Sequence, residues 1–208
     1  MVRDFGFAPN PFHGACTLAT CKPVLRRVAR AGDWVFGVGG VRLGDAGRLI
    51  FGMNVSETMS FDQYWLDPRF QRKKPIRNGS LSTLVGDNIY HRDPASGDWI
   101  QADSHHSRPD GTADPDNIRS DTATDRVLIA KRFVYFGKSA ISIPEELLED
   151  LGYASGRGHR KYDDAQAAAL LSWMESCTRD RWGLIVGEPH EFDDGAARYA
   201  GGKDKIVR

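Results

Sequence analysis

The sequence predicts an α+β fold for this chain of 208 residues. Two apolar segments, 34–38 and 49–55, are joined by a glycine-rich loop, which is typical of a β-hairpin with a long tip. A short helix is expected to begin at Pro23, because the first helical position tolerates a residue without an amide hydrogen. A longer helix is predicted to run from a capping pair of aspartates at 163–164 to about Ser176.

The first part of the chain leads into this hairpin. Residues 2–7 are expected to form a short strand that ends at a proline-rich turn. In the helix that begins at Pro23, the apolar side chains of Val24, Leu25 and Val28 share one face, and the neighbouring arginines lie largely off it. We expect the apolar face to pack on the protein.

After the hairpin, residues 61–65 are predicted to form a helical turn, and segments 88–91 and 99–102 form the arms of a second hairpin. The polar segment 103–126 has little periodicity and is interpreted as a long loop. A loop of that length in a compact domain is usually functional or disordered. The pattern then predicts two more strands, the second of them over 133–136.

The last third of the chain adds helices to this core. A short acidic helix is expected over 145–151, ahead of the helix that begins at 163–164. We interpret residues 1–187 as one α+β domain, with its core roughly at 1–143 and a helical C-terminal part at 144–187. Residues 188–208 are weakly patterned and are predicted to be a weakly ordered tail.

Composition limits the possible settings of the protein. Hydrophobic residues make up 40% of the chain, and Lys+Arg balance Asp+Glu at 28 each, so any polyanion site must come from local clustering. The three cysteines lack CxxC spacing, which is typical neither of a disulfide framework nor of a zinc ribbon. No apolar run approaches the roughly 20 residues of a membrane span, and no signal-peptide core is present. We expect a cytoplasmic protein without membrane contact.

The densest cluster of polar and ionisable side chains is the segment Asp103-Ser104-His105-His106-Ser107. Its carboxylate and imidazoles could supply a general base, a proton shuttle or part of a metal site, with His13 or His91 recruited from elsewhere. The alternatives are contact with a ligand and a structural role in the loop. In an extended segment Asp103 and His105 point to the same side and His106 to the other. Adjacent histidines alone are a poor metal signature, so we assign no metal and no cofactor.

A second group of residues is suited to recognising a base. The turn at Asn10, Phe12 and His13 offers an amide, a ring and an imidazole, although Phe12 could equally belong to the core. The other candidates for ligand contact are Trp34, Tyr64, Trp65, Asn88, Tyr90 and His91. Aromatic residues on strands are more often core than cage, which favours a core position for Trp34.

Two basic segments could hold phosphate groups. The first runs from Arg69 to Arg77, and its candidates for phosphate contact are Arg72, Lys73 and Lys74. The second contains Arg157 and His159, and the neighbouring Gly156 and Gly158 let backbone amides approach an anion. A solvated basic loop is the alternative for both segments.

Nucleophiles are less clearly indicated. Cys16 and Cys21 lie near the first turn, but no sequence feature marks either of them as a thiolate, and a buried structural cysteine is the default interpretation. The chain contains no GxSxG, HExxH or dinucleotide-binding GxGxxG pattern.

Several sequence blocks between about Arg3 and His159 carry a family resemblance. They are FGFAPNPFHGACTLATCKP, AGDWVFGVGG, DPRFQRKKP, NGSL, GDNIYH, WIQADSHHS, VLIAKRFVYFG and GRGH. Together they resemble a bacterial and phage family, the second of the numbered nucleotide-modification-associated domains. This resemblance implies an association with DNA-modification genes, and hence with DNA-modification or defence proteins as partners, more than it implies a reaction.

A second resemblance concerns the fold. The helix, the Gly-Asp turn at 32–33 and the paired strands are similar to the core of PUA-like barrels, the superfamily of the EVE, YTH and ASCH domains. This implies a PUA-like, partly open β-barrel with peripheral helices. It also implies a ligand that is a nucleotide or modified base, possibly within DNA or RNA.

Three functions follow as expectations. The first is recognition of a nucleotide or modified base in a bacterial or phage DNA-modification or defence setting. The alternative is a nucleotide-directed hydrolase or transferase in which Asp103 or His105 acts as acid or base and His13 assists. The third is a structural partner in a DNA-modification complex.

Overall fold

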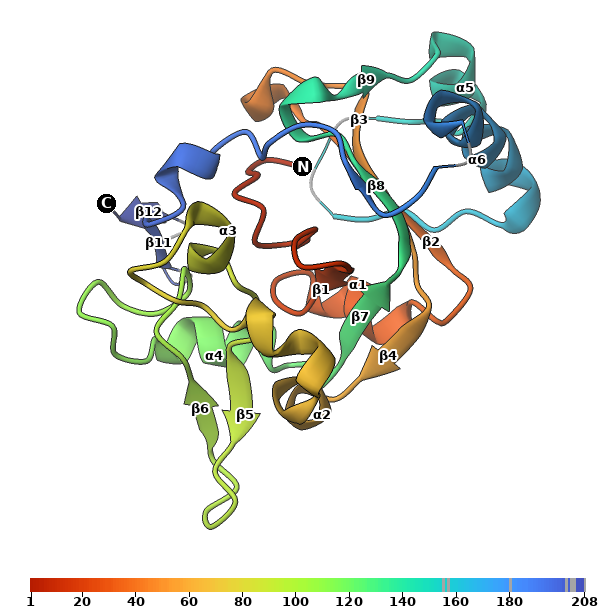
Figure 1. Cartoon of the computed structure of the whole chain (residues 1–208). Coiled ribbons are helices and arrows are strands. Elements are labelled where there is room, and N and C mark those ends of the chain that lie inside the picture. The colour runs from red at the N-terminus through yellow and green to blue at the C-terminus, as the bar shows by residue number, and fades with distance from the viewer. Residues whose placement is uncertain (155, 157, 180, 201, 203–204, 208) are drawn as a thin grey trace.

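Two small β-sheets, linked by chain segments that pass from one to the other, form the centre of the molecule in the computed structural model (Figure 1). The structure describes residues 1–154, 156, 158–179, 181–200, 202 and 205–207. The strands are β1 (Cys16–Leu18), β2 (Trp34–Val38), β3 (Arg48–Asn54), β4 (Glu57–Met59), β5 (Tyr90–Arg92), β6 (Trp99–Gln101), β7 (Val127–Ala130), β8 (Arg132–Tyr135), β9 (Ile141–Ser142), β10 (Leu184–Ile185), β11 (Arg198–Ala200) and β12 (Lys205–Val207). The helices are α1 (Pro23–Val28), α2 (Phe61–Leu66), α3 (Leu81–Leu84), α4 (Pro115–Asp121), α5 (Glu145–Asp150) and α6 (Asp164–Thr178), with 3₁₀ turns η1 (Val41–Leu43), η2 (Pro68–Lys73), η3 (Gly137–Ser139) and η4 (Phe192–Asp194).

The two central sheets have the strand orders β10-β8-β3-β2, with β9 also on β3, and β1-β7-β4. Strand β3 is followed almost at once by β4, and β7 by β8, so one antiparallel pair of chains passes through both sheets. None of the sheets formed by the described residues closes into a barrel. The α+β class is therefore confirmed, and the PUA-like architecture stays a prediction.

Both predicted hairpins are present. β2 and β3 pair from Trp34 opposite Asn54 to Val38 opposite Leu49, with an irregularity after Gly37. β5 and β6 pair along their full length and project from the body of the molecule in Figure 1. Alternating side chains and strong turn residues specify such local pairings, which is why the sequence predicts them.

The core lies between the sheets and the helices. The side chains of Met53, Leu128 and Phe133 are buried inside the bent strand pair. On the other side, α6 packs Leu170 and Met174 against β3 and β8. No helix among the described residues has both the length and the apolar character needed to cross a membrane.

The sequence-based interpretation of α1 is wrong about its buried face. Arg26 is fully buried, whereas Val24 and Val28 are exposed by 47% and 46%. The Arg26 guanidinium donates hydrogen bonds to four backbone carbonyls, those of Cys21, Asp121, Thr124 and Arg126. A buried guanidinium is tolerated because its donors find acceptors, and amphipathic spacing does not reveal such a site.

Three other segments differ from expectation. Residues 2–7 form no strand, and the long loop contains α4, capped by the Asp114 side chain on the amides of Asp116 and Asn117. The Asp-Pro pair that opens α4 is a helix-start signal that the interpretation as a loop overlooked. Residues 188–200 contain η4 and β11, held by tertiary contacts that sequence periodicity does not record.

Candidate functional site

Cys21 lies on the turn that joins β1 to α1. Cys21 and Lys22 adopt left-handed backbone angles, with φ of 54° and 42°, which are uncommon for residues with side chains. Two hydrogen bonds hold the turn: Cys21 N donates to Asp121 Oδ1 at 2.8 Å, and Arg26 Nε donates to the Cys21 carbonyl at 2.9 Å. A sharp strand–turn–helix that presents a half-buried thiol is the setting of a nucleophile elbow.

Two further side chains complete a relay with this thiol. His106 Nε2 lies 3.7 Å from Cys21 Sγ, and His106 Nδ1 lies 2.6 Å from Asp121 Oδ2. His106 and Asp121 are 3% and 2% exposed, so the half-buried Cys21 is the most exposed member of the relay. This is the order nucleophile, base and orienting carboxylate of a cysteine-dependent active site.

The charges in the relay stabilise one another. Burial opposes protonation of His106, but the Asp121 carboxylate and the facing sulfur outweigh it and raise the pKa of His106 to about 10. Burial likewise opposes ionisation of Asp121, yet the charge and hydrogen bond of His106 keep its pKa below the usual value. An imidazolium beside a sulfur stabilises the thiolate, which is the nucleophilic form of cysteine.

Polar groups around the relay hold the imidazole of His106 in place. Tyr90 Oη donates to Asp121 Oδ2 at 2.9 Å, and Gln101 Nε2 donates at 3.0 Å both to Tyr90 Oη and to the His106 carbonyl. The Asn117 side chain donates to the same carbonyl at 2.7 Å. With its partners so placed, His106 has one orientation, which a base needs.

The same three donors could be considered as metal ligands, because one atom from each of Cys21, His106 and Asp121 lies within 4.8 Å of the others. Both carboxylate oxygens, however, already accept hydrogen bonds, Oδ1 from Cys21 N and Oδ2 from Tyr90 and His106. A metal at Oδ2 would have to displace Tyr90 or the His106 N–H. The hydrogen-bonded relay fits the donor set better.

The segment 103–107 divides its side chains among three surroundings. His106 joins the relay, as a catalytic role would require. His105 packs against Phe5, bonds the Ala197 carbonyl through Nδ1 at 2.6 Å, and has its pKa lowered to about 3 by burial and by His106. Asp103 is partly exposed and pairs with Arg198. Among the described residues, the side chains of Asp103 and His105 thus form no hydrogen bond with Cys21, His106 or Asp121.

Several predicted ligand residues lie in a buried polar network instead. Lys73 Nζ donates to Asn10 Oδ1 at 2.7 Å, and burial lowers the pKa of Lys73 to about 8. Tyr64 Oη donates to Asp87 at 2.8 Å, and the Asn88 amide donates to the Tyr64 carbonyl at 2.9 Å. All five side chains are fully buried, so the folded chain does not present them to a phosphate or base. Tyr90, also buried, supports the relay.

Other predicted ligand residues do meet near the surface. The Trp65 ring stacks on His91, with centroids 4.1 Å apart, and Lys74 Nζ lies 3.7 Å from the Trp65 ring centre. His91 Nδ1 is buried without a hydrogen-bond partner among the described residues.

The remaining candidates are scattered. Phe12 stacks on Phe192, and Trp34 on Phe36. His13, whose Nε2 is buried without a partner among the described residues, lies close enough to Arg72 and Lys73 to have its pKa lowered by them as well as by burial. Arg72 and His159 are exposed, and Arg157 lies outside the described residues.

Sequence reasoning missed Asp121 and set Cys21 aside. Asp121 lies in the segment interpreted as a loop, and 85 residues separate Cys21 from its base. The available signal was the place of Cys21, two positions before the proline that opens α1 and three after the end of β1, because a nucleophile elbow places its reactive side chain between a strand and a helix.

Comparison with known proteins gives the chain its family. No curated protein and no solved structure shows significant similarity to it. A family model described as "Nucleotide modification associated domain 2" matches residues 1–196. The chain therefore belongs to this family, as the sequence blocks indicate.

Proposed function

We propose that this protein is a cysteine-dependent hydrolase or transferase that acts on a nucleotide or modified base. The observation that carries the proposal is the Cys21–His106–Asp121 relay, with 3.7 Å from sulfur to imidazole and 2.6 Å from imidazole to carboxylate. The nucleotide substrate rests on the family, which is associated with nucleotide modification. The class is that of the enzymatic alternative predicted from the sequence, but Cys21 is the nucleophile and His106 the acid and base.

The proposed reaction proceeds in two steps. In the resting pair the thiol proton is held on His106 Nε2, and the Cys21 thiolate attacks an electrophilic carbon of the substrate, such as that of an amide or ester. His106 then gives the proton to the departing nitrogen or oxygen, which leaves an acyl-thioester on Cys21. Water or another acceptor, deprotonated by His106, releases the acyl group and restores the thiol. Asp121 keeps Nδ1 protonated so that Nε2 faces the sulfur.

The experiment is turnover of a panel of modified nucleotides, followed by mass spectrometry of the products. We expect a product with the wild-type protein and with Cys177→Ala, which removes an exposed cysteine far from the relay in sequence. We expect none with Cys21→Ala or His106→Gln. Turnover by Cys21→Ala at the wild-type rate would refute the proposal. Turnover that is lost on treatment with a chelator would instead identify a metal-dependent reaction.

Recognition of a base is the second candidate function. It is favoured by the surface contact of Trp65, His91 and Lys74, which combines two rings and a cation. This expectation comes from the PUA-like resemblance. The order of elements along the chain, with α1 followed by the Gly-Asp turn and the β2–β3 hairpin, supports that resemblance. A nucleotide retained unchanged by the wild-type protein, with affinity lost in Trp65→Ala and kept in Cys21→Ala, would select recognition over catalysis.

A further inference from the structure

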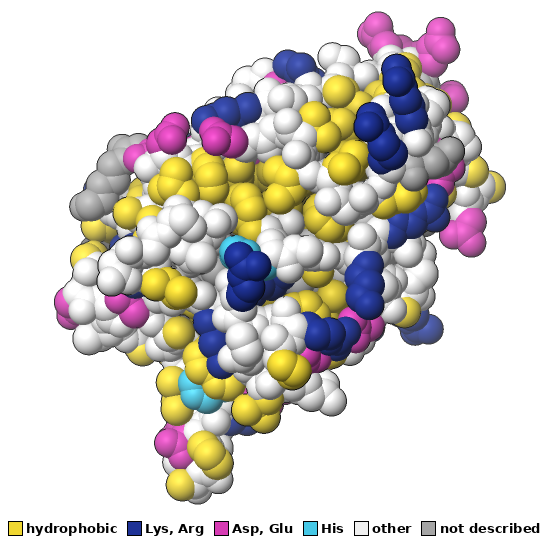
Figure 2. Space-filling model, in the orientation of Figure 1, with side chains coloured by type: hydrophobic (Ala, Val, Ile, Leu, Met, Phe, Trp, Pro, Cys, Tyr) yellow, Lys and Arg dark blue, Asp and Glu magenta, His cyan; other side chains and the backbone are white. Residues whose placement is uncertain are grey.

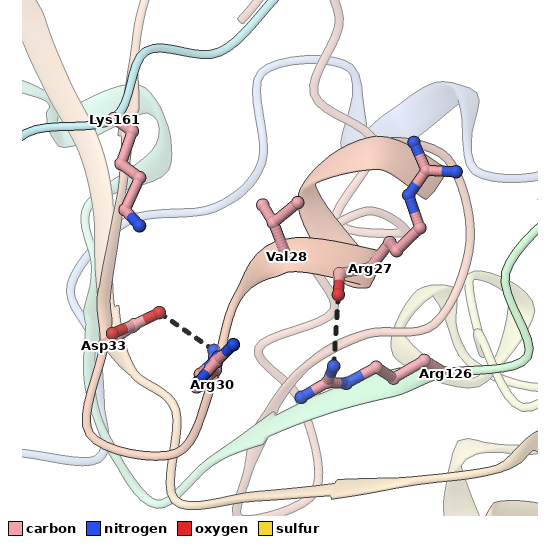
Figure 3. Close-up of a pocket in the computed structure, with 6 residues that line it drawn as sticks. All are labelled: Arg27, Val28, Arg30, Asp33, Arg126 and Lys161. Atoms are coloured by element: carbon pink, nitrogen blue, oxygen red, sulfur yellow. Dashed lines mark hydrogen bonds between the residues drawn. The ribbon is translucent and has the colours of Figure 1, made fainter.

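A basic pocket lies beside α1, the helix that follows the turn at Cys21. It has a volume of about 600 Å³ and is lined by Arg27, Val28, Arg30, Asp33, Arg126 and Lys161 (Figure 3). Lys161, Arg30 and Arg126 lie around one space, whereas the Arg27 side chain points away from it and contributes its carbonyl. Three cationic side chains thus face a single opening.

The pocket contains little negative charge to offset them. Asp33 is the one acidic residue of the lining, and its Oδ2 accepts a hydrogen bond from the Arg30 amide at 2.9 Å. None of the ion pairs formed between described residues involves Arg30, Arg126 or Lys161. In Figure 2, Lys and Arg side chains are frequent on the side of the molecule where Figure 1 places β2, β4 and α6.

Arg126 carries an unused donor into this wall. Its Nη1 donates to the Arg27 carbonyl at 3.1 Å, but its Nε is buried without a hydrogen-bond partner among the described residues. An unpartnered buried guanidinium nitrogen costs free energy unless an acceptor arrives. An anion in the pocket supplies an acceptor for the Arg126 guanidinium, because phosphate oxygens match the guanidinium fork, and a small shift of the side chain would bring the buried Nε to it.

The pocket and the thiol relay share a structural support. The buried guanidinium of Arg26 donates to the carbonyl of Cys21 at 2.9 Å and to that of Arg126 at 2.6 Å. The same guanidinium also binds the Asp121 carbonyl. One side chain therefore fixes the nucleophile turn, the orienting aspartate and a wall of the basic pocket relative to each other.

We propose that this pocket binds a phosphate group of the molecule on which Cys21 acts. The inference rests on the proposed function, which supplies the nucleotide, and adds the place where its phosphate is held. The phosphate belongs either to a free nucleotide or to the backbone of a nucleic-acid strand. The chemistry in the pocket is the same for both.

The test measures binding to the Cys21→Ser protein, in which turnover does not interfere. Two fluorescent probes are used, a deoxynucleoside 5′-monophosphate and a short single-stranded oligodeoxynucleotide. Each is titrated against this protein, against Arg30→Glu/Lys161→Glu in the same background, and against Arg42→Glu/Arg108→Glu. The last pair alters two exposed arginines outside the pocket and changes the net charge equally.

We expect the pocket pair of substitutions to weaken binding at least tenfold and the control pair to leave it within about twofold. Weaker binding of both probes assigns the pocket to a nucleotide's own phosphate, and weaker binding of the oligonucleotide alone assigns it to strand phosphates. For the oligonucleotide, the logarithm of the association constant is also plotted against the logarithm of the salt concentration. The slope of this plot should become shallower by about 0.7 for each phosphate that the pocket no longer neutralises.

Equal weakening by both pairs of substitutions, or no binding with the pocket intact, overturns the inference. Neither result bears on Cys21 chemistry, which the turnover panel measures separately. Conversely, a protein that binds phosphate in this pocket and shows no turnover keeps the pocket and loses the proposed function.

Discussion

The proposed reactivity of Cys21 depends on one neighbouring side chain. His106 Nε2 is the basic group that faces the sulfur, and its other nitrogen is bound to Asp121. Removal of a positioned base commonly lowers a rate by about 100-fold or more. We therefore expect His106→Gln to slow alkylation of Cys21 by iodoacetamide at pH 7 by about that factor. The measurement is peptide mass spectrometry of the labelled protein over time.

The exposed cysteine provides an internal control for that experiment. Cys177 lies on α6, away from the relay in sequence, and its labelling rate should be the same in both proteins. Equal slowing at Cys177 and Cys21 would mean that the substitution had acted on the whole protein rather than on the relay.

Asp121 is expected to matter for stability as well as for catalysis. It accepts from His106, Tyr90 and the Cys21 amide while 2% exposed. Breaking a buried ion pair from one side typically costs about 3–5 kcal/mol. Asp121→Asn should lower the free energy of unfolding by this order in urea denaturation, whereas Asp116→Asn, at an exposed pair with Arg119, should cost below about 1 kcal/mol. Similar losses in the two variants would contradict the buried pairing.

At the scale of elements, α1 is anchored by a charged side chain rather than by an apolar face. Arg26 donates to four carbonyls from positions before α1, at the end of α4 and before β7. Lysine cannot reproduce this planar arrangement of donors. We expect Arg26→Lys to lower the free energy of unfolding by about 2 kcal/mol or more, and Arg27→Lys, with its exposed side chain, to change it by less than about 0.5 kcal/mol. A comparison of the two urea midpoints decides this.

Local patterns account for the elements that the sequence predicts well. The hairpins β2–β3 and β5–β6, and the capping box of α6 at Asp163 and Gln166, depend on residues close to one another in the chain. The helix α1 begins at Pro23 as expected, yet its pattern does not reveal the buried residue, because three of the four acceptors of Arg26 lie 95 to 100 residues away. Tertiary acceptors of this kind leave no periodic signal.

In the candidate site, too, some residues are recognisable from local sequence and others only from tertiary contacts. His106 is recognisable from sequence, since few side chains act as a base at neutral pH. Its partners, Cys21 and Asp121, are not recognisable from sequence, because the pairing of β1 with β7 and the packing of α4 bring them to His106. Conversely, Lys73 and Asn88 have side chains suited to ligand binding, and their burial became evident only from the packing of η2 against Asn10 and α2.

At the scale of the whole molecule, one histidine links three distant segments. His190 Nδ1 lies 3.0 Å from Asp4 Oδ2, and its Nε2 bonds Asp45 in the glycine-rich tip of the first hairpin. The hydrogen bond with Asp4 is the main cause that raises the pKa of His190, with Asp45 adding to it. The segment predicted as a tail is thereby tied to both the N-terminus and the first hairpin.

This link predicts a pH dependence of stability. The raised pKa means that the protonated form is favoured in the folded state. The stabilisation that protonated His190 gives the folded state is fully present below the ordinary histidine pKa of about 6.5. It is lost as the pH rises through the higher pKa that His190 has in the folded state. The difference in melting temperature between wild type and His190→Gln should therefore be largest near pH 5.5 and shrink above pH 6.5. A difference that grows with pH would contradict this assignment.

The most direct measurement of the central claim is mass spectrometry of the protein, both intact and after proteolytic digestion, quenched with acid during incubation with a modified nucleotide. A relay in which Cys21 is the nucleophile predicts an adduct on the peptide that contains Cys21, present in the wild type and in Cys177→Ala. The adduct should be absent from Cys21→Ala, which should also be inactive. Continued turnover by Cys21→Ala, with no adduct on any cysteine of the wild type, would contradict the account.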